Sequence, residues 1–135
     1  MSAVFLLDTN ICIYIHRQRP PQLLARFARL KVGEAAVSVI TYGELLCGAQ
    51  KSQWRAKAMK VLDEFIAAVP ALALPVQAAS VYGAIRAALE ARGEIIGGND
   101  LWIAAHAKAA DLTLVTNNER EFRRVPGLKI QNWAA

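Results

Sequence analysis

Short apolar runs alternate with longer segments of helical periodicity along most of the chain. Each run has the length of a buried strand and ends at polar or turn-forming residues. The expected strands are 4–7, 35–40, 72–75, 112–116 and, as a last edge strand, 128–133. Strands separated by helices predict an α/β fold, with a mostly parallel central sheet of about four to five short strands flanked by helices on both faces.

The segments between these strands have the features of helices. Apolar side chains recur at three- and four-residue spacing, and Gly93 follows the longest of these segments as a predicted C-terminal cap. Thr41 precedes Glu44 by three residues, which is typical of a capping box at a helix start. The expected helices are 11–17, 20–31, 41–51, 54–69, 76–93, 100–110 and 117–124.

Composition indicates one globular domain, residues 1–135, with 55% hydrophobic and 20% charged residues. Charges or prolines interrupt every apolar run well short of the roughly 18–20 residues that a membrane span needs. Asp8 comes after only five apolar residues, with no basic segment before them, which is unlike a signal peptide. We therefore expect a cytoplasmic protein with no membrane association.

The spacing of the cysteines argues against a zinc site, and the net charge favours a nucleic-acid partner. Cys12 and Cys47 are far apart and lack the spacing of a zinc site, so both are expected to be buried free thiols. Sixteen Lys and Arg against 11 Asp and Glu give a net charge of +5, which favours an anionic partner, nucleic acid first.

Three acids stand where they could share one site. Asp8 directly follows strand 4–7, Glu44 lies in the first helical turn after strand 35–40, and Asp100 opens a helix behind Gly97 and Gly98. Residues just past the carboxyl ends of parallel strands meet at one edge of the sheet. Each acid alone could be a helix cap, but together they predict a carboxylate pocket.

Clustered carboxylates require a counter-charge, and hard oxygen ligands select Mg²⁺ or Mn²⁺. A carboxylate-held cation in a basic protein suggests phosphodiester hydrolysis, with basic side chains holding the nucleic-acid backbone outside the acidic pocket. Tyr42 is a candidate for stacking on RNA bases. The basic candidates are Arg17, Arg19, Arg26, Arg29, Lys51, Arg55, Arg120, Arg123 and Arg124.

Three blocks of sequence resemble the PIN-domain family, specifically the VapC toxins of bacterial type II toxin–antitoxin modules. They are LLDTNICIY at the start, SVITYGELLCGA in the middle, and the stretch from IGGNDLWIAAHAKAADLTLVTNNEREF to the end. The resemblance implies a Mg²⁺-dependent endoribonuclease that cleaves tRNA or other structured RNA and inhibits translation. It also implies Asp8 and Asp100 as principal metal ligands, Glu44 as the acid that completes the site, a VapB-type antitoxin partner, a homodimer and toxin–antitoxin hetero-oligomers.

The chain departs from the family pattern at the fourth acidic position. Many PIN domains carry T-x-D there, whereas this sequence reads Thr116-Asn117-Asn118. The amide of Asn118 brings no charge, so either Glu119 or Glu121 reaches into the site or the site has three acids. The missing fourth acid argues against a tightly held second metal ion, but it does not argue against the nuclease prediction.

Two other functions remain open from sequence. Asp8 could be the nucleophile of an aspartyl phosphatase or phosphoacceptor domain, although such phosphatases carry a second Asp where this chain has Asn10. Alternatively, a PIN domain could bind RNA or an antitoxin without cleaving it. The presence of all three acids argues for catalysis.

Overall fold

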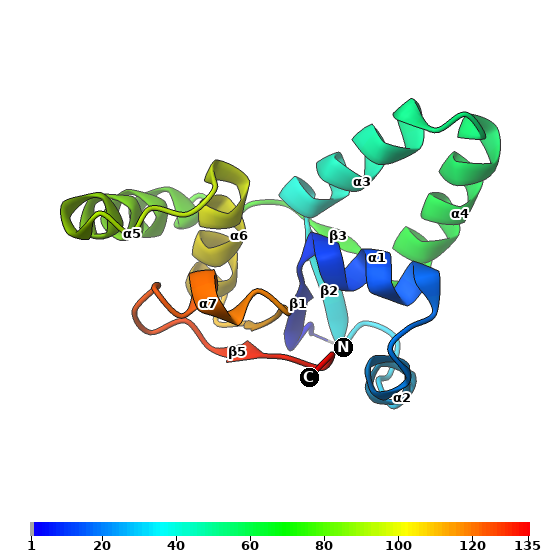
Figure 1. Cartoon of the computed structure of the whole chain (residues 1–135), viewed down its shortest axis with the longest axis horizontal. Helices are drawn as coiled ribbons and strands as arrows, with labels where there is room; N and C mark the ends of the chain where they lie inside the picture. Colours follow the sequence, from blue (N-terminus) through cyan, green and yellow to red (C-terminus); the bar gives the residue numbers. More distant parts are fainter. Residues whose placement is uncertain (1) are drawn as a thin grey trace.

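Five short strands form the centre of the structure, a computed structural model that describes residues 2–135 (Figure 1). They lie in the order β3-β2-β1-β4-β5, and every neighbouring pair is parallel. This arrangement confirms the predicted α/β class and the predicted parallel sheet. The strands are β1 (Phe5–Leu7), β2 (Ala35–Ser38), β3 (Ala71–Leu72), β4 (Thr113–Val115) and β5 (Ile130–Gln131).

Helices connect these strands. The helix that ends at Arg92 is capped by Gly93 at φ 67°, a left-handed conformation that glycine adopts without strain, which confirms the predicted cap. The helices are α1 (Thr9–Arg17), α2 (Pro21–Ala28), α3 (Val39–Lys51), α4 (Arg55–Ala68), α5 (Ala78–Arg92), α6 (Gly98–Ala109) and α7 (Glu119–Phe122).

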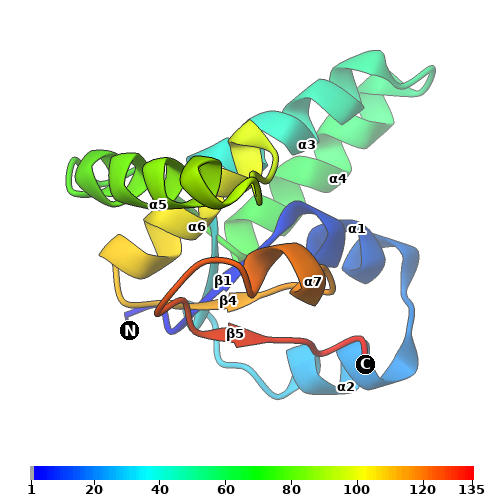
Figure 2. The same ribbon diagram turned by 60° about the vertical axis from the view of Figure 1, so that its left-hand side comes forward.

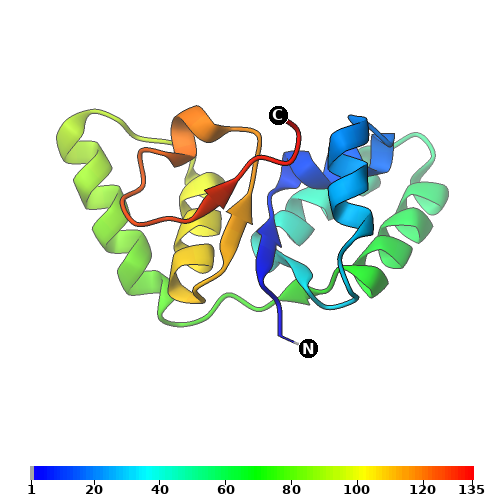
Figure 3. The ribbon, with the colours of Figure 1, turned by 90° about the horizontal axis from the view of Figure 1, so that it is seen from below.

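The two faces of the sheet are covered by different helices (Figure 3). Successive side chains of a strand point to opposite faces, so Leu6 packs with α5, α6 and Phe122, whereas Leu7 packs with α1, α2 and α4. Both leucines have no exposed surface. The sheet is therefore buried on both sides, which explains why its strands are continuous apolar runs rather than alternating ones.

The strand order places a topological switch point between β1 and β4. From β1 the chain moves outward through β2 to β3, then returns to add β4 and β5 on the other side of β1. In open parallel sheets the crevice at the carboxyl ends of such strands is the usual ligand site. Away from this crevice, α3 and α4 run side by side and project from the sheet (Figure 2).

Several predicted boundaries are wrong, including those of two strands. The expected strand 35–40 ends at Ser38, whose side-chain oxygen accepts a hydrogen bond from the Ile40 amide at 3.1 Å and caps α3. Thr41 thus lies inside the helix, and the predicted capping box with Glu44 does not form. The expected strand 72–75 is displaced, because β3 is the two-residue strand 71–72.

The two cysteines differ in environment. Cys12 is buried, as expected, and burial together with the nearby Asp8 charge raises the pKa of its thiol well above its usual range. Cys47 is exposed on α3, so the prediction that it is buried is wrong. Within residues 2–135, no helix is long and apolar enough to cross a membrane.

This difference predicts selective thiol chemistry. At pH 8, one thiol per chain should react rapidly with Ellman's reagent in the folded protein and two in denaturant, because only thiolates are nucleophilic. A Cys47→Ser variant should lack the rapid phase. Rapid reaction of that variant would show that Cys12 is accessible and would contradict its burial.

Candidate active site

Asp8 is fixed at the end of β1 by two hydrogen bonds. One carboxylate oxygen, Oδ1, accepts from the Ile11 amide at 2.8 Å and makes Asp8 the N-cap of α1. The other, Oδ2, accepts from the Thr116 hydroxyl at 2.5 Å. The register of β1 on β4 pairs Leu7 with Val115, so Asp8 and Thr116 follow neighbouring strands side by side. With 4% of its surface exposed, Asp8 is held in one orientation below the sheet edge.

Glu44 is turned toward α1 rather than toward the start of its own helix. The Thr9 hydroxyl donates to Glu44 Oε1 at 2.6 Å, and Thr41 Oγ1 lies 3.2 Å from the same hydroxyl. Because Thr9 follows Asp8 directly, this bond brings the Glu44 carboxylate beside the Asp8 site. This geometry supports the expectation that Glu44 shares a pocket with the other acids, and the bond to Thr9 rather than the predicted capping box orients its carboxylate.

Asp100 is the third residue of α6. We expected Asn99 or Asp100 to cap this helix, but the N-cap is Gly97, one turn earlier. The carboxylate nevertheless stays close to that cap, since a Cβ atom on Gly97 would lie 3.7 Å from Asp100 Oδ2. The positive end of the helix dipole stabilises a carboxylate in the first turn.

The electrostatics show that these carboxylates lie within range of one another. Burial raises the pKa of Asp8 to about 6, with smaller contributions from the charges of Asp100 and Glu44, and the hydrogen bonds from Thr116 and Ile11 oppose the rise. Burial also raises the pKa of Asp100, followed by the charges of Glu121 and Glu44. We name these four acids, Asp8, Glu44, Asp100 and Glu121, the acidic cluster.

Glu121 is the acid that contacts Asn118, the residue at the fourth acidic position of the family pattern. The Asn118 side-chain amide donates to Glu121 Oε2 at 3.0 Å, while the Asn118 backbone amide donates to the Thr116 hydroxyl at 2.9 Å. Glu119 instead accepts from Arg123 at 2.7 Å and from Asn132 at 3.0 Å. Of the three candidates, Glu121 thus carries charge toward Asp100, Asn118 orients Glu121, and Glu119 is engaged elsewhere.

The donor set fits a hard divalent cation. All four members of the acidic cluster offer carboxylate oxygens, and their mutual repulsion favours a counter-ion. In the part of the chain that the structure describes, no three acid, histidine or cysteine side chains already surround a single point closely enough to hold a metal. The chemistry of these side chains thus suits Mg²⁺, whereas their positions do not form a ready-made metal site.

The other candidate residues lie in different environments. Tyr42 is half-buried and packs in the core cluster with Leu7 and Val37, whereas Arg17 and Arg120 are exposed. His106 is 1% exposed, and its Nδ1 lies 2.9 Å from the hydroxyl of Ser38, so it supports the α3 cap from within the core. Burial lowers the pKa of His106.

Sequence reasoning missed the role of Thr116. We considered this residue only as the first letter of the fourth motif, yet its hydroxyl donates to Asp8 and accepts from the Asn118 amide. It is fully buried. The signal was available, since two neighbouring parallel strands that both end in polar residues place those residues side by side.

Comparisons with known proteins find similar chains over almost the whole length of this one. The family model for the PIN domain matches residues 5–128. Ribonuclease VapC2 of Haemophilus influenzae is 42% identical over 129 residues, covering 96% of this chain and 97% of the relative. The tRNA(fMet)-specific endonuclease VapC of Shigella flexneri is 40% identical, covering 96% and 98%. The DNA-bound VapBC structure from Salmonella typhimurium superposes with a TM-score of 0.90 at 40% identity, covering 97% of this chain and 98% of its own.

Because the pKa of Asp8 is higher in the folded protein than in the unfolded chain, its ionised carboxylate lowers the free energy of unfolding. The size of this destabilising effect depends on pH. The folded protein binds more protons than the unfolded chain between pH 3.8 and about 6, so this cost grows over that range and is constant above it. In EDTA at pH 7.5, Asp8→Asn should therefore raise the free energy of unfolding by up to about 3 kcal/mol, and the gain should fade toward pH 4. Urea denaturation measures both values.

Glu119→Gln is the control for this experiment. Hydrogen bonding from Asn132 and the Arg123 charge lower the pKa of Glu119, so removing this charge should not stabilise the protein at pH 7.5. If Asp8→Asn were no more stable than the original protein at any pH, the electrostatic cost at Asp8 would be refuted.

Proposed function

Since the chain belongs to the PIN-domain family, and within it to the VapC ribonucleases, we propose that it is the toxin of a type II toxin–antitoxin system. Its activity is metal-dependent endoribonucleolytic hydrolysis of RNA phosphodiester bonds, which inhibits translation. The observation that supports this proposal is the hydrogen bond that holds Glu44 on Thr9, next to Asp8, together with the effect of the Asp100 and Glu44 charges on the pKa of Asp8.

We assign Asp8, Glu44 and Asp100 as the catalytic acids and ligands of Mg²⁺, for which Mn²⁺ can substitute. PIN-domain nucleases are generally dependent on a divalent metal. When bound, the cation supplies positive charge that orients and activates a water and polarises the scissile phosphate. Glu121, oriented by Asn118, adds negative charge at the fourth position of this site.

The neighbouring side chains pre-organise these acids. Thr116 and the Ile11 amide hold both oxygens of Asp8, and Thr9 holds Glu44. A carboxylate held by packed neighbours loses little rotational freedom when it binds a cation. Thr9 and Thr116 are therefore positioning residues, and the acids that they orient touch the metal and the RNA.

Transfer RNA is the substrate class that we favour. Two of the relatives are tRNA(fMet)-specific endonucleases, from Shigella flexneri at 40% identity and Salmonella typhimurium at 40% identity. The net charge of +5 suits a polyanionic substrate, and exposed Arg17 and Arg120 are candidates for contacts with its backbone. We also propose that the protein acts in the cytoplasm, where this substrate occurs.

An apolar groove beside the acidic cluster suits the antitoxin. A cavity of about 530 Å³ runs from Thr9 and Glu44 along α3 and α4, past Leu45, Phe65 and the 68% exposed Trp54. Because solved relatives such as the Salmonella typhimurium protein are VapBC complexes, we propose that a segment of a VapB-type antitoxin lies here and covers the acids. A homodimer of this chain then forms part of the toxin–antitoxin hetero-oligomer.

The phosphatase alternative is weaker. Phosphatases with an aspartyl nucleophile carry a second Asp two residues after the first, and this chain has Asn10 at that position. Loss of one of the three acids would have favoured a non-cleaving domain, and all three are present.

Metal-dependent cleavage is the direct test of the proposed function. Purified protein, free of antitoxin, should cleave tRNA with Mg²⁺ or Mn²⁺ and stop in EDTA. Asp8→Asn and Asp100→Asn should each lower the rate at least about a hundredfold, because each removes a charged ligand. Undiminished cleavage by Asp100→Asn would remove that residue from the metal site.

Glu121 and Glu119 form a matched pair for the fourth position. Glu121→Gln should raise the Mg²⁺ concentration for half-maximal cleavage about tenfold, since it removes negative charge beside Asp100. Glu119→Gln changes net charge equally on the same helix and should leave the metal requirement within about twofold of the original. Metal titrations of cleavage rate distinguish the two, and equal effects would contradict the assignment of Glu121.

A further inference from the structure

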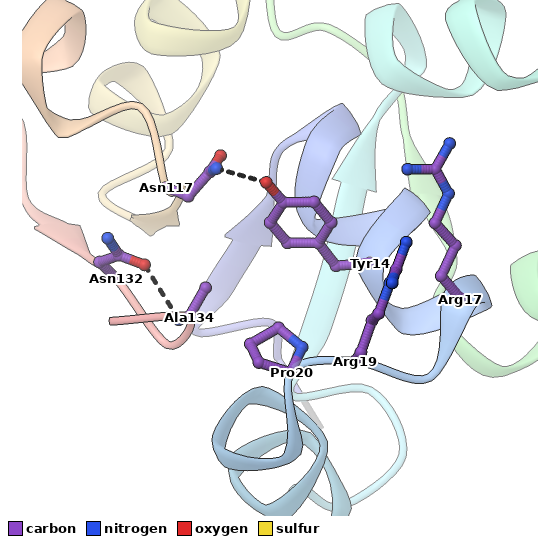
Figure 4. A pocket seen from close by; sticks show the side chains of 7 residues that line it. All are labelled: Tyr14, Arg17, Arg19, Pro20, Asn117, Asn132 and Ala134. Atoms are coloured by element: carbon purple, nitrogen blue, oxygen red, sulfur yellow. Dashed lines mark hydrogen bonds between the residues drawn. The ribbon is translucent and has the colours of Figure 1, made fainter.

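A second cavity opens at the same edge of the sheet, on the side of α1 away from the apolar groove (Figure 4). Its volume is about 520 Å³, and its walls come from α1, the segment after it, the end of β4 and the end of the chain. The residues that give it polar character are Tyr14, Arg17, Arg19, Asn117 and Asn132. Of these residues, only Arg17 has a role in the proposed function, as a candidate contact with the RNA backbone.

The cavity is built onto the acidic cluster. Asn117 follows Thr116, whose hydroxyl binds the Asp8 carboxylate. Tyr14 stands on α1, the helix that Asp8 caps. Asn117 and Tyr14 therefore come from the two chain segments that leave the switch point between β1 and β4. The cavity and the Asp8 site thus share two chain segments, although no member of the acidic cluster lines the cavity.

The charge of the cavity suits an anion. Arg17 and Arg19 are exposed, and no ion pair in the described residues 2–135 involves either guanidinium. The acidic cluster repels a polyanion, so a phosphate near it needs positive charge from another source. Arginine binds phosphate oxygens with two parallel hydrogen bonds and is well suited to this role.

The polar interior suits a hydrogen-bond donor. The Asn117 side-chain amide donates to the Tyr14 hydroxyl at 2.7 Å, and Figure 4 shows the two groups pointing at each other. The Asn117 carbonyl oxygen is buried and has no hydrogen-bond partner within the described chain. Asn132 differs, because its oxygen accepts from the Ala134 amide at 2.9 Å and its nitrogen donates to Glu119. Asn117 is thus the amide with bonding capacity left for a ligand.

We propose that this cavity binds one nucleotide of the RNA substrate adjacent to the cleaved bond. Arg17 and Arg19 hold its backbone phosphate, and the Asn117 side chain turns toward the cavity so that its now buried oxygen accepts a hydrogen bond from the base or ribose. The inference rests on the proposed ribonuclease function and deepens it by assigning a specificity subsite. An acidic side chain of a protein partner would satisfy the arginines but has no donor for Asn117, so a nucleotide fits better.

Binding measurements test the phosphate contacts without requiring catalysis. The probe is a fluorescein-labelled single-stranded RNA ten-mer of mixed sequence, followed by fluorescence anisotropy in EDTA. Arg17→Gln/Arg19→Gln should weaken binding about tenfold and lower the salt dependence, as the slope of log K against log salt, by roughly two. Lys31→Gln/Lys60→Gln, which removes the same charge from exposed sites outside the cavity, should change affinity less than about twofold.

Cleavage-end mapping tests the role of Asn117. Asn117→Ala and Asn117→Ser should relax the base preference at one position beside the cut while Mg²⁺ dependence is retained, and thermal melts establish that both variants fold. Tyr14→Phe should relax the same position more weakly, because it removes only the partner of the amide. A purely structural role for Asn117 would lower the rate evenly at all sites, and that result would overturn the assignment.

The possible results distinguish a failure of the nucleotide subsite from a failure of the proposed ribonuclease function. If the original protein fails to cleave any RNA with Mg²⁺ or Mn²⁺, the proposed function fails. If it cleaves but the Arg17/Arg19 variant binds the ten-mer as tightly as the original protein, the subsite is overturned. The subsite is also overturned if that variant loses antitoxin binding alone, because the cavity then belongs to the protein partner.

Discussion

The burial of a carboxylate at the end of β1 is the constraint on which the whole site depends. Asp8 receives hydrogen bonds from Ile11 and Thr116, yet these do not offset its desolvation and the nearby charges, and its pKa rises to about 6. Such a group is unfavourable in isolation and is retained where function requires it. The start of α1 and the end of β4 supply the two groups that hold this carboxylate in place.

Most of the fold could be predicted because the spacing of apolar residues along the chain follows which side chains are buried in each strand or helix. The sheet is covered on both faces, so its strands read as unbroken apolar runs, and the helices between them show their own spacing. The errors occurred where local capping overrode the pattern. Val39 and Ile40 continue the apolar run of β2, but the Ser38 side chain caps a helix there and ends the strand. Gly97 likewise starts α6 a turn before the expected acid.

The acids of the site were predictable for a topological reason, whereas their supporting contacts were not. Residues that follow parallel strands converge whatever their side chains, which is why Asp8 and Glu44 could be grouped from sequence. The choice between Glu119 and Glu121 depends on which side of a four-residue helix faces Asp100. The Tyr14–Asn117 bond joins residues 103 positions apart, a pairing that no local pattern encodes. The exposure of Cys47 likewise depends on how α3 projects.

The hydrogen bond between Asp8 and Thr116 spans 108 residues of sequence. The ribosome synthesises Asp8 early and Thr116 only near the end of the chain. A nascent chain therefore contains the Asp8 carboxylate before the hydroxyl that orients it. Truncated products share this defect, because any chain that stops before β4 lacks one wall of the crevice. For a nuclease of the proposed kind, such an order of assembly delays activity until translation of that copy is almost finished.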